Sequence, residues 1–283
     1  MMESDSEMLK QILDASRLQV IAQCASVVRS HLQDEAAKSP DLPILAGHKV
    51  YSQNDEDGIT LEIFSRIGIK HKTFFEIGVG NGMENNTLFW LKQGWKGVWI
   101  DGSDSNAEFI NRYFAHAMEE GNLTFRQAMI RVENIDAIVE TTEFSGQEID
   151  LLSIDIDGND YYIFQKLSTL NPRLVIIEYN SKYPPPVKWR IPYDREYVWN
   201  GSDWFGASLC TMSELFEKKG YTLVGCNMTG SNAFYVRNDL LGDYFPFAGD
   251  VKKLYQPPRY YLTTAYYFPI AGHGASNQLD WEE

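Results

Sequence analysis

Carboxylates at the ends of two apolar segments are the residues of this chain that are best suited to chemistry. The first segment is followed by Asp155, Asp157 and Asp160, and the second by Glu178. Ligands of open α/β sheets bind beyond the carboxyl ends of the strands, so these acids are expected at a ligand-binding edge. There they can act as general bases or bind a hard cation such as Mg²⁺. The structural alternatives are that the aspartates cap the next helix and that Glu178 is a buried, hydrogen-bonded acid.

A glycine-rich turn earlier in the chain indicates a cofactor. An acid stands two residues before three alternating glycines, at the end of an apolar run: Glu76, Gly78, Gly80 and Gly82. About twenty residues later, a second apolar run ends on Asp101. A glycine turn lets the backbone come close to a ligand, and an acid at the next strand end can accept hydrogen bonds from both ribose hydroxyls. Together they predict a nucleoside-containing cofactor.

The spacing of the glycines distinguishes between cofactors. The nicotinamide pattern G-x-G-x-x-G/A requires a third small residue, because the helix must pack closely on the strand there. That position is Met83 when the pattern starts at Gly78, and Asn85 when it starts at Gly80. The order E-x-G-x-G-x-G instead resembles motif I of the class I S-adenosylmethionine-dependent methyltransferases. An NAD-dependent oxidoreductase and a non-catalytic binding module of the same fold are the alternatives.

The acidic segment resembles one branch of that superfamily. Residues 153–161 read Ser-Ile-Asp-Ile-Asp-Gly-Asn-Asp-Tyr, which is similar to the FkbM-like methyltransferases. The resemblance covers roughly residues 50–240 and implies S-adenosylmethionine as the cofactor. In that family the loop before motif I also borders the cofactor. The implied cofactor-binding residues are Gln53, Asp57, Glu76, Gly78, Gly80, Gly82, Asn86, Thr87, Asp101, Gly102, Ser103 and Asp155.

The expected reaction is methylation of an oxygen atom on a small polar metabolite or saccharide intermediate. A hydroxyl acceptor needs a base, and Asp155, Asp157 and Asp160 are the candidates. A divalent metal, Mg²⁺, held by Asp155, Asp157 and Glu178 would lower the pKa of the hydroxyl. The sequence leaves open whether the reaction uses a metal.

An aromatic insertion, residues 181–208, lies between the fifth expected strand and the next helix. Its position over the catalytic edge suits substrate recognition, and its aromatic faces suit a sugar or another hydroxylated small molecule. A folded cover or a dimer surface is the alternative. The substrate candidates are Asn180, Lys182, Tyr183 and Trp204, and Lys182, Lys188 and Arg190 are candidates for binding a substrate anion.

Alternating strands and helices must position these residues. Strands are expected at 73–79, 97–101, 123–129, 149–156, 173–179, 221–226 and 232–237, and helices at 84–93, 104–120, 132–141, 160–168 and 209–219. This alternation predicts a Rossmann-like α/β fold, with a seven-stranded, mostly parallel sheet and helices on both faces. The last two strands are joined by a turn too short for a parallel crossover, so they are expected to form a C-terminal antiparallel hairpin.

The chain is expected to have three parts. They are an N-terminal helical extension (1–45), the methyltransferase domain (46–245) with its insertion (181–208), and a C-terminal tail (246–283). A helix at 7–37 is expected to pack on the domain, with a dimer contact or an active-site cover as the alternatives. The partners expected are a small-molecule substrate and a second copy in a homodimer.

Composition excludes some other partners. The 283 residues carry a net charge of −14, which disfavours a nucleic acid or an anionic membrane surface. The three cysteines are widely scattered and show neither metal-ligand spacing nor a disulfide framework. With acids in place of the bases of a signal peptide near the N-terminus, the expected location is the cytoplasm.

Overall fold

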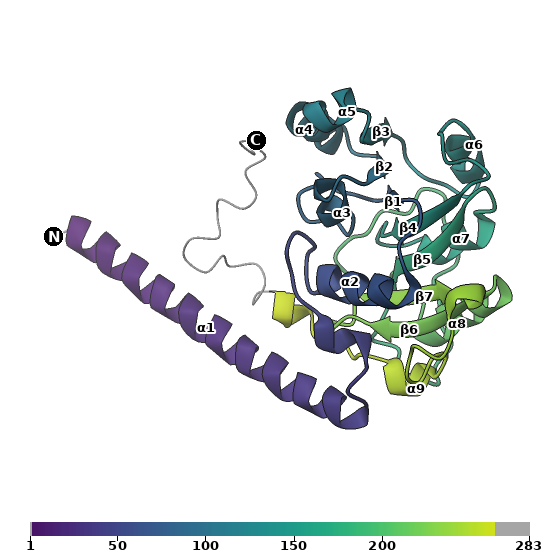
Figure 1. Cartoon of the computed structure of the whole chain (residues 1–283). Helices are drawn as coiled ribbons and strands as arrows, with labels where there is room; N and C mark the ends of the chain where they lie inside the picture. Colours follow the sequence, from purple (N-terminus) through teal and green to yellow (C-terminus); the bar gives the residue numbers. More distant parts are fainter. Residues whose placement is uncertain (1, 264–283) are drawn as a thin grey trace.

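The computed structural model describes residues 2–263, and its centre is a seven-stranded sheet with helices on both sides (Figure 1). The strand order is β3-β2-β1-β4-β5-β7-β6. The strands are β1 (Thr73–Ile77), β2 (Lys96–Asp101), β3 (Leu123–Gln127), β4 (Glu148–Ile154), β5 (Asn171–Glu178), β6 (Tyr221–Cys226) and β7 (Asn232–Arg237). The helices are α1 (Met2–Lys38), η1 (Pro43–Ala46), α2 (Glu56–Ile67), α3 (Leu88–Lys92), α4 (Asp104–Tyr113), α5 (Ala115–Glu119), α6 (Ile135–Glu140), α7 (Asp160–Lys166), α8 (Leu209–Lys218), η2 (Asn238–Leu240), α9 (Val251–Leu254) and η3 (Tyr260–Leu262).

Strand pairing confirms the predicted fold class. The ladders β3–β2, β2–β1, β1–β4 and β4–β5 are parallel. Strand β7 pairs antiparallel with both β5 and β6, as the short turn between β6 and β7 requires. The order of the strands reverses between β1 and β4, and the carboxyl ends of these two strands are where a ligand is expected to bind.

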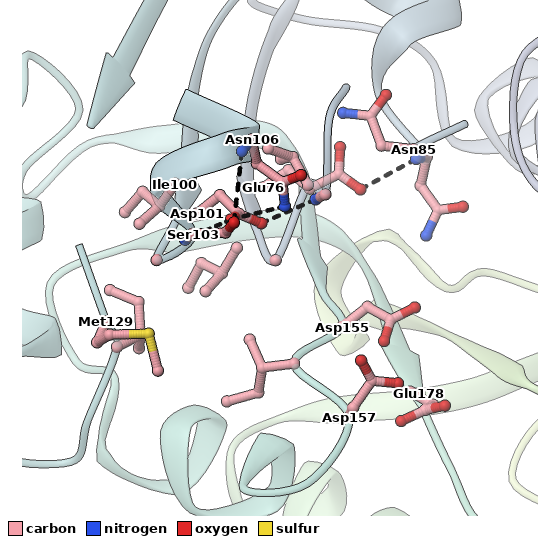
Figure 2. A pocket seen from close by; sticks show the side chains of 18 of the residues that line it. Glu76, Asn85, Ile100, Asp101, Ser103, Asn106, Met129, Asp155, Asp157 and Glu178 are labelled. Atoms are coloured by element: carbon pink, nitrogen blue, oxygen red, sulfur yellow. Dashed lines mark hydrogen bonds between the residues drawn. The ribbon is translucent and has the colours of Figure 1, made fainter. Parts of the chain in front are cut away.

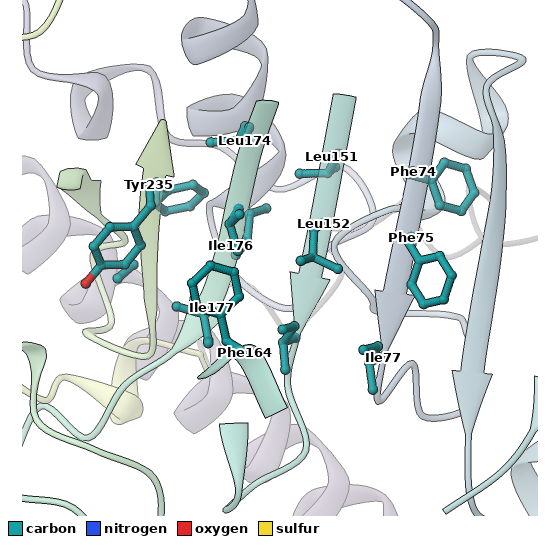
Figure 3. Close-up of a cluster of buried hydrophobic side chains, with 14 of the residues drawn as sticks. Phe74, Phe75, Ile77, Leu151, Leu152, Phe164, Leu174, Ile176, Ile177 and Tyr235 are labelled. Atoms are coloured by element: carbon teal, nitrogen blue, oxygen red, sulfur yellow. The ribbon is translucent and has the colours of Figure 1, made fainter. Parts of the chain in front are cut away.

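The central strands β1, β4 and β5 are rich in apolar residues because helices cover both faces of the sheet. Phe74, Phe75, Leu151, Leu152 and Ile176 are fully buried. Figure 3 shows them side by side in the core between the strands and the covering elements. Burying one side chain of this kind stabilises the fold by about 1.5–3 kcal/mol. This rigid sheet holds the strand ends, and therefore the acids that follow them, in fixed positions.

Two expected helices differ from the structure. The segment 84–93 is helical only at Leu88–Lys92, because the backbone N–H groups of Asn86 and Thr87 donate to Glu76, the acid of the glycine turn. The segment 104–120 is two helices rather than one. The break falls at Phe114, which is buried against Trp99 with their ring centroids 4.8 Å apart. Tertiary packing of this aromatic residue overrides the helical pattern of the sequence.

Helix α1 packs on the domain only through its C-terminal part. Cys24 is 7% exposed and Glu35 is 2% exposed, whereas Leu9 and Leu18 are 67% and 68% exposed. Figure 1 shows the N-terminal half of the helix projecting away from the sheet. The expectation of a helix packed on the domain is therefore correct only for its C-terminal part. Among residues 2–263, no helix has both the length and the apolar character needed to cross a membrane.

The three expected parts of the chain remain predictions, although the structure places their segments. The insertion 181–208 runs without a helix from β5 to α8, and its single isolated bridge joins Arg190 to Ala207. The described part of the tail contains α9 and η3. Its last twenty residues, 264–283, lie outside the described residues.

An ion-pair cluster around Glu148, at the amino-terminal end of the sheet, predicts how the stability of the fold changes in acid. Glu148 accepts hydrogen bonds from Lys70 at 2.7 Å and from Arg237 at 2.6 Å, which lower its pKa to about 2. A carboxylate with a lowered pKa stabilises the fold above its unfolded pKa, and this contribution is lost as the pH falls from about 4.5 towards 2. Because the cluster is partly solvated, we expect Glu148→Gln to cost about 1–2 kcal/mol at pH 7.

Urea unfolding at a series of pH values measures this effect. The difference between wild type and Glu148→Gln should shrink steadily below pH 4.5, whereas the exposed Glu140→Gln should match wild type throughout. A difference that stays constant down to the acid limit would contradict the assignment.

Candidate active site

A cavity of about 540 Å³ lies at the carboxyl ends of β1, β2, β4 and β5. Figure 2 shows Asp101 and Ser103 on one side of it, and Asp155, Asp157 and Glu178 on the other. The predicted site residues that line it are Gln53, Glu76, Gly78, Gly80, Asn86, Asp101, Gly102, Ser103, Asp155, Asp157 and Glu178. The structure therefore brings most of the predicted cofactor residues and all three predicted metal ligands to one cavity.

Asp101 joins the glycine turn to the helix that follows β2. Its Oδ2 accepts a hydrogen bond from the Gly80 backbone N–H at 2.9 Å. Its Oδ1 accepts from the Ser103 backbone N–H at 2.9 Å and from Asn106 Nδ2 at 3.0 Å. The carboxylate is thus held in one orientation at the cavity wall, where the remaining lone pair of Oδ2 can accept a further donor.

The three glycines have different structural roles. A Cβ at Gly78 would lie 1.7 Å from the Asp155 carbonyl oxygen, so this glycine permits the close approach of β1 to the end of β4. Gly80 has φ +57° and open space around its Cβ position, as a ligand-facing turn requires. A Cβ at Gly82 would lie 2.7 Å from the Trp99 ring, and Gly82 is not among the lining residues. The prediction that Gly82 contacts the cofactor is corrected to a packing role.

Glu76 is a buried acid that holds residues 86–87, after the glycine turn, by hydrogen bonds. It accepts from the backbone N–H groups of Asn86 at 3.0 Å and Thr87 at 3.1 Å, and from the Thr87 hydroxyl. Burial raises its pKa to about 7, although these donors act in the opposite direction. Thr87 is fully buried, lies outside the cavity lining and supports Glu76, and its contact with a cofactor stays a prediction.

Asp57 supports the cavity from outside it. Its Oδ2 accepts from the backbone N–H groups of Val50, Tyr51 and Ser52 at 2.6–2.8 Å. The side chain is 1% exposed and is not among the lining residues. The predicted cofactor contact of Asp57 is therefore corrected: it holds the loop that places Gln53 at the cavity.

Three acids meet at the other side of the cavity. One carboxylate oxygen each of Asp155, Asp157 and Glu178 lies within 4.8 Å of the others. Glu178 Oε2 is buried and has no hydrogen-bond partner within residues 2–263. Burial, followed by repulsion from the neighbouring acids, raises the pKa of Asp155 and of Glu178 well above the usual range. Such a group of oxygens is suited to a hard cation or to a proton from a bound hydroxyl.

Asp160 belongs to the turn beneath this acid group. Its two carboxylate oxygens accept from the backbone N–H groups of Ile156 and Gly158, each at 2.9 Å. It is fully buried, which raises its pKa to about 6, and it does not line the cavity. The prediction of Asp160 as a catalytic base is corrected, because its carboxylate caps the turn that carries Asp157.

The predicted substrate residues lie outside the cavity lining. Asn180 is fully buried and donates to the carbonyl oxygens of Asp203 and Phe205. Lys182 forms an ion pair with Asp203, and Tyr183 stacks on Trp189 with their ring centroids 4.0 Å apart. Trp204 packs edge-on against Trp189. These four residues shape the insertion itself and have no contact with the cavity.

The other cations proposed for a substrate anion are also engaged, with residues of the neighbouring helices α8 and α7. Lys188 forms an ion pair with Glu214, and the Arg190 guanidinium lies 4.6 Å from the centre of the Tyr161 ring. The insertion reaches the cavity through Arg195 and Tyr197 instead. Other lining residues that the sequence did not identify include Asn81, Glu84, Asn85, Asn106, Met129, Ser231 and Asn232.

Gly158 is where the insertion packs on the end of β4. A Cβ at this position would lie 2.4 Å from the Tyr197 ring. We expect Gly158→Ala to displace Tyr197 and to lower turnover by about tenfold or more, because small misplacements of a site are costly. Val198→Ala, at a position of the same insertion that is 74% exposed and outside the cavity lining, is the control for a general effect on this segment. Equal turnover of Gly158→Ala and wild type would contradict a role of Tyr197 in the cavity wall.

No protein-family model matches the chain, and no curated protein matches its sequence. Solved structures of similar fold exist. An S-adenosylmethionine-dependent methyltransferase from Aquifex aeolicus is 12% identical, with 62% of this chain and 88% of that chain covered and a TM-score of 0.37. An O-methyltransferase from Bacillus cereus in complex with S-adenosylhomocysteine is 16% identical, with 74% and 89% covered and a TM-score of 0.41.

The N-terminal domain of EvdMO1, also with S-adenosylhomocysteine bound, is 12% identical, with 74% of this chain and 94% of that chain covered and a TM-score of 0.43. These identities and TM-scores are too low to carry an argument about activity. The fold assignment rests on the directions of the strands, a parallel set and a C-terminal antiparallel hairpin, as the sequence predicts.

Proposed function

We propose that this protein is an S-adenosylmethionine-dependent methyltransferase that methylates a hydroxyl group of a small polar molecule. One observation carries the proposal: a single cavity joins Asp101 and the glycine turn to the acid group Asp155, Asp157 and Glu178. The side with Asp101 and the glycine turn is suited to bind a nucleoside. The side with the acid group is suited to stabilise a positive charge and to take the proton of an acceptor hydroxyl. The assignment to the FkbM-like branch rests on residues 153–161 alone.

The residues of the first side fit the proposed cofactor. Asp101 has acceptor capacity left for a ribose hydroxyl, and the backbone around Gly80 is open to the cavity. Ile100, Met129 and Ile130 provide apolar lining beside them, as a purine ring requires. Bound S-adenosylmethionine would supply an electrophilic methyl group, and transfer would form an oxygen–carbon bond as the sulfur–carbon bond breaks.

The acid group also fits a divalent cation, and we propose Mg²⁺ there. Asp155, Asp157 and Glu178 would hold it, and the buried, unpartnered Glu178 Oε2 supports this assignment. A bound Mg²⁺ would lower the pKa of an acceptor hydroxyl. Asp155 and Asp157 are the proposed groups that take the acceptor proton, since they lie at the cavity and Asp160 does not.

Isothermal calorimetry with S-adenosylhomocysteine tests the proposed function. Binding of one equivalent per chain is expected, and the absence of binding at millimolar ligand by the intact chain would overturn the proposal. Fluorescence of NADH on mixing is the test of the oxidoreductase alternative, for which no enhancement is expected. A non-catalytic module would bind the cofactor product and transfer no methyl group to any acceptor.

The remaining expectations about partners and location are predictions from the sequence. They are a small-molecule acceptor, no nucleic acid or membrane partner, a homodimer and a cytoplasmic location. The exposed apolar side chains of the N-terminal half of α1 are compatible with a contact between two copies, and the mass of the protein in solution measures it.

A further inference from the structure

Two buried amide oxygens line the acid side of the cavity. Asn159 is 8% exposed and Asn232 is 5% exposed, and both are lining residues. The Oδ1 atom of each has no hydrogen-bond partner within the part of the chain that the structure describes. Buried acceptors normally have a partner, so these two atoms indicate a donor that belongs to a ligand.

The hydrogen bonds of the two Nδ2 atoms determine how the side-chain amides of Asn159 and Asn232 are oriented. Asn159 Nδ2 donates to the Asp194 carbonyl oxygen at 2.8 Å, and Asn232 Nδ2 donates to Glu56 Oε1 at 3.0 Å. Glu56 also accepts from the side-chain amide of Asn227 at 2.7 Å. Because a carbonyl and a carboxylate accept hydrogen bonds, each amide must turn its nitrogen towards them. The two Oδ1 atoms are therefore available to a ligand in the cavity.

Both oxygens lie beside the acid group. Asn232 is the antiparallel partner of Glu178 in the β5–β7 ladder, and Asn159 follows Asp157 by two residues. Along the described lining the acids outnumber the cations, of which Arg195 is the only one. The Arg195 side chain is 60% exposed and its Nε lies 3.4 Å from Glu196 Oε1, so it lies at the rim. An acceptor with a phosphate or carboxylate would meet repulsion here, whereas hydroxyl donors would satisfy the amides.

We propose that Asn159 and Asn232 bind hydroxyl groups of an uncharged, polyhydroxylated acceptor such as a sugar ring or a cyclitol. This inference rests on the proposed methyltransferase function. One hydroxyl of the acceptor is methylated beside Asp155 and Asp157, and its neighbours donate to the two amide oxygens. The two asparagines therefore determine which acceptors enter, and they act neither on the cofactor nor on the metal.

Methyl transfer from labelled S-adenosylmethionine in the presence of Mg²⁺ tests the substrate class. The uncharged probes are myo-inositol, methyl α-glucopyranoside and methyl α-mannopyranoside, and the charged probes are myo-inositol 1-phosphate, glucose 6-phosphate and glucuronate. Label is expected in at least one uncharged probe. Label only in charged probes, or in no uncharged probe while S-adenosylhomocysteine binds, overturns the inference. Failure to bind S-adenosylhomocysteine overturns the proposed function instead.

Asn159→Ala and Asn232→Ala test the two residues with the best uncharged probe. Each is expected to lower kcat/KM about 5- to 20-fold, the effect of one lost hydrogen bond to a bound hydroxyl. The affinities for S-adenosylhomocysteine and Mg²⁺ should stay within about twofold of wild type. Asn200→Ala, an exposed residue of the insertion outside the cavity lining, is the matched control.

Three results would contradict the roles of these residues. Unchanged kcat/KM in both variants would show that the amide oxygens do not touch the acceptor. A loss of Mg²⁺ affinity would make them metal ligands. A parallel loss of S-adenosylhomocysteine affinity would make them structural, since Asn232 also binds the buried Glu56.

Discussion

Replacing Asp101 by alanine is expected to weaken S-adenosylhomocysteine binding by about 1–3 kcal/mol, or about 5- to 150-fold in the dissociation constant. The variant removes the proposed acceptor for a ribose hydroxyl. It also removes the carboxylate that accepts from the Gly80 N–H, so the glycine turn loses one of its links to β2 and keeps the backbone link from Gly78 to Ile100. Isothermal calorimetry on both proteins measures the change.

Asp104→Ala is the matched control for this prediction. Asp104 is an exposed acid in the first turn of α4, outside the cavity lining, and its replacement changes the net charge equally. The affinity of this control should stay within about twofold of wild type, because only long-range charge changes. Equal affinities of wild type and Asp101→Ala would remove Asp101 from the cofactor site.

The cofactor side of the cavity was predictable because short segments of sequence carry it. The spacing of Gly78, Gly80 and Asp101 encodes a strand, a turn and the end of the next strand, and the parallel register of β1 and β2 then brings them together. The pattern does not distinguish Gly82, whose role depends on Trp99 and Phe114 from distant parts of the chain. Spacing alone treats all three glycines as one motif.

The acceptor side was less predictable because it is assembled from segments far apart in the sequence. Asn232 reaches the cavity only through the antiparallel register that places it opposite Glu178. Arg195 and Tyr197 depend on the path of an insertion that has no periodic pattern. The aromatic composition of the insertion identified it as a candidate for substrate recognition. Its position after the fifth expected strand indicated that it lies over the strand ends. It did not indicate which of its side chains turn inward.

Asp57 and Asp160 show why the sequence indicates which acids lie near the site more readily than it indicates the role of each. Each stands next to the predicted site in sequence, yet each accepts hydrogen bonds from backbone N–H groups of a neighbouring turn. Turn formation of this kind competes with ligand binding for the same residue types. Within residues 2–263, Asp57 and Glu178 each keep one buried oxygen without a partner. Asp57 differs from Glu178 because its other oxygen holds a loop and because it lies outside the cavity lining.

Glu178→Gln is expected to lower methyl transfer by about 10²-fold or more, with S-adenosylhomocysteine affinity within about twofold of wild type. The amide keeps the size of the side chain and removes one anionic oxygen donor from the acid group. Mg²⁺ affinity, measured by calorimetric titration, should fall about 10- to 100-fold. A variant that binds Mg²⁺ like wild type would show that Glu178 is not a ligand.

The same substitution should stabilise the protein while it removes activity. Glu178 is a partly buried acid among Asp155, Asp157 and Asp160, so a neutral amide in its place relieves burial of charge and mutual repulsion. The free energy of unfolding in the absence of divalent cations is expected to rise by about 1–2 kcal/mol, whereas the exposed Glu217→Gln should leave it unchanged. An inactive variant of lowered stability would point to a structural role. An inactive variant of raised stability would show that the protein retains a destabilising acid for its chemistry.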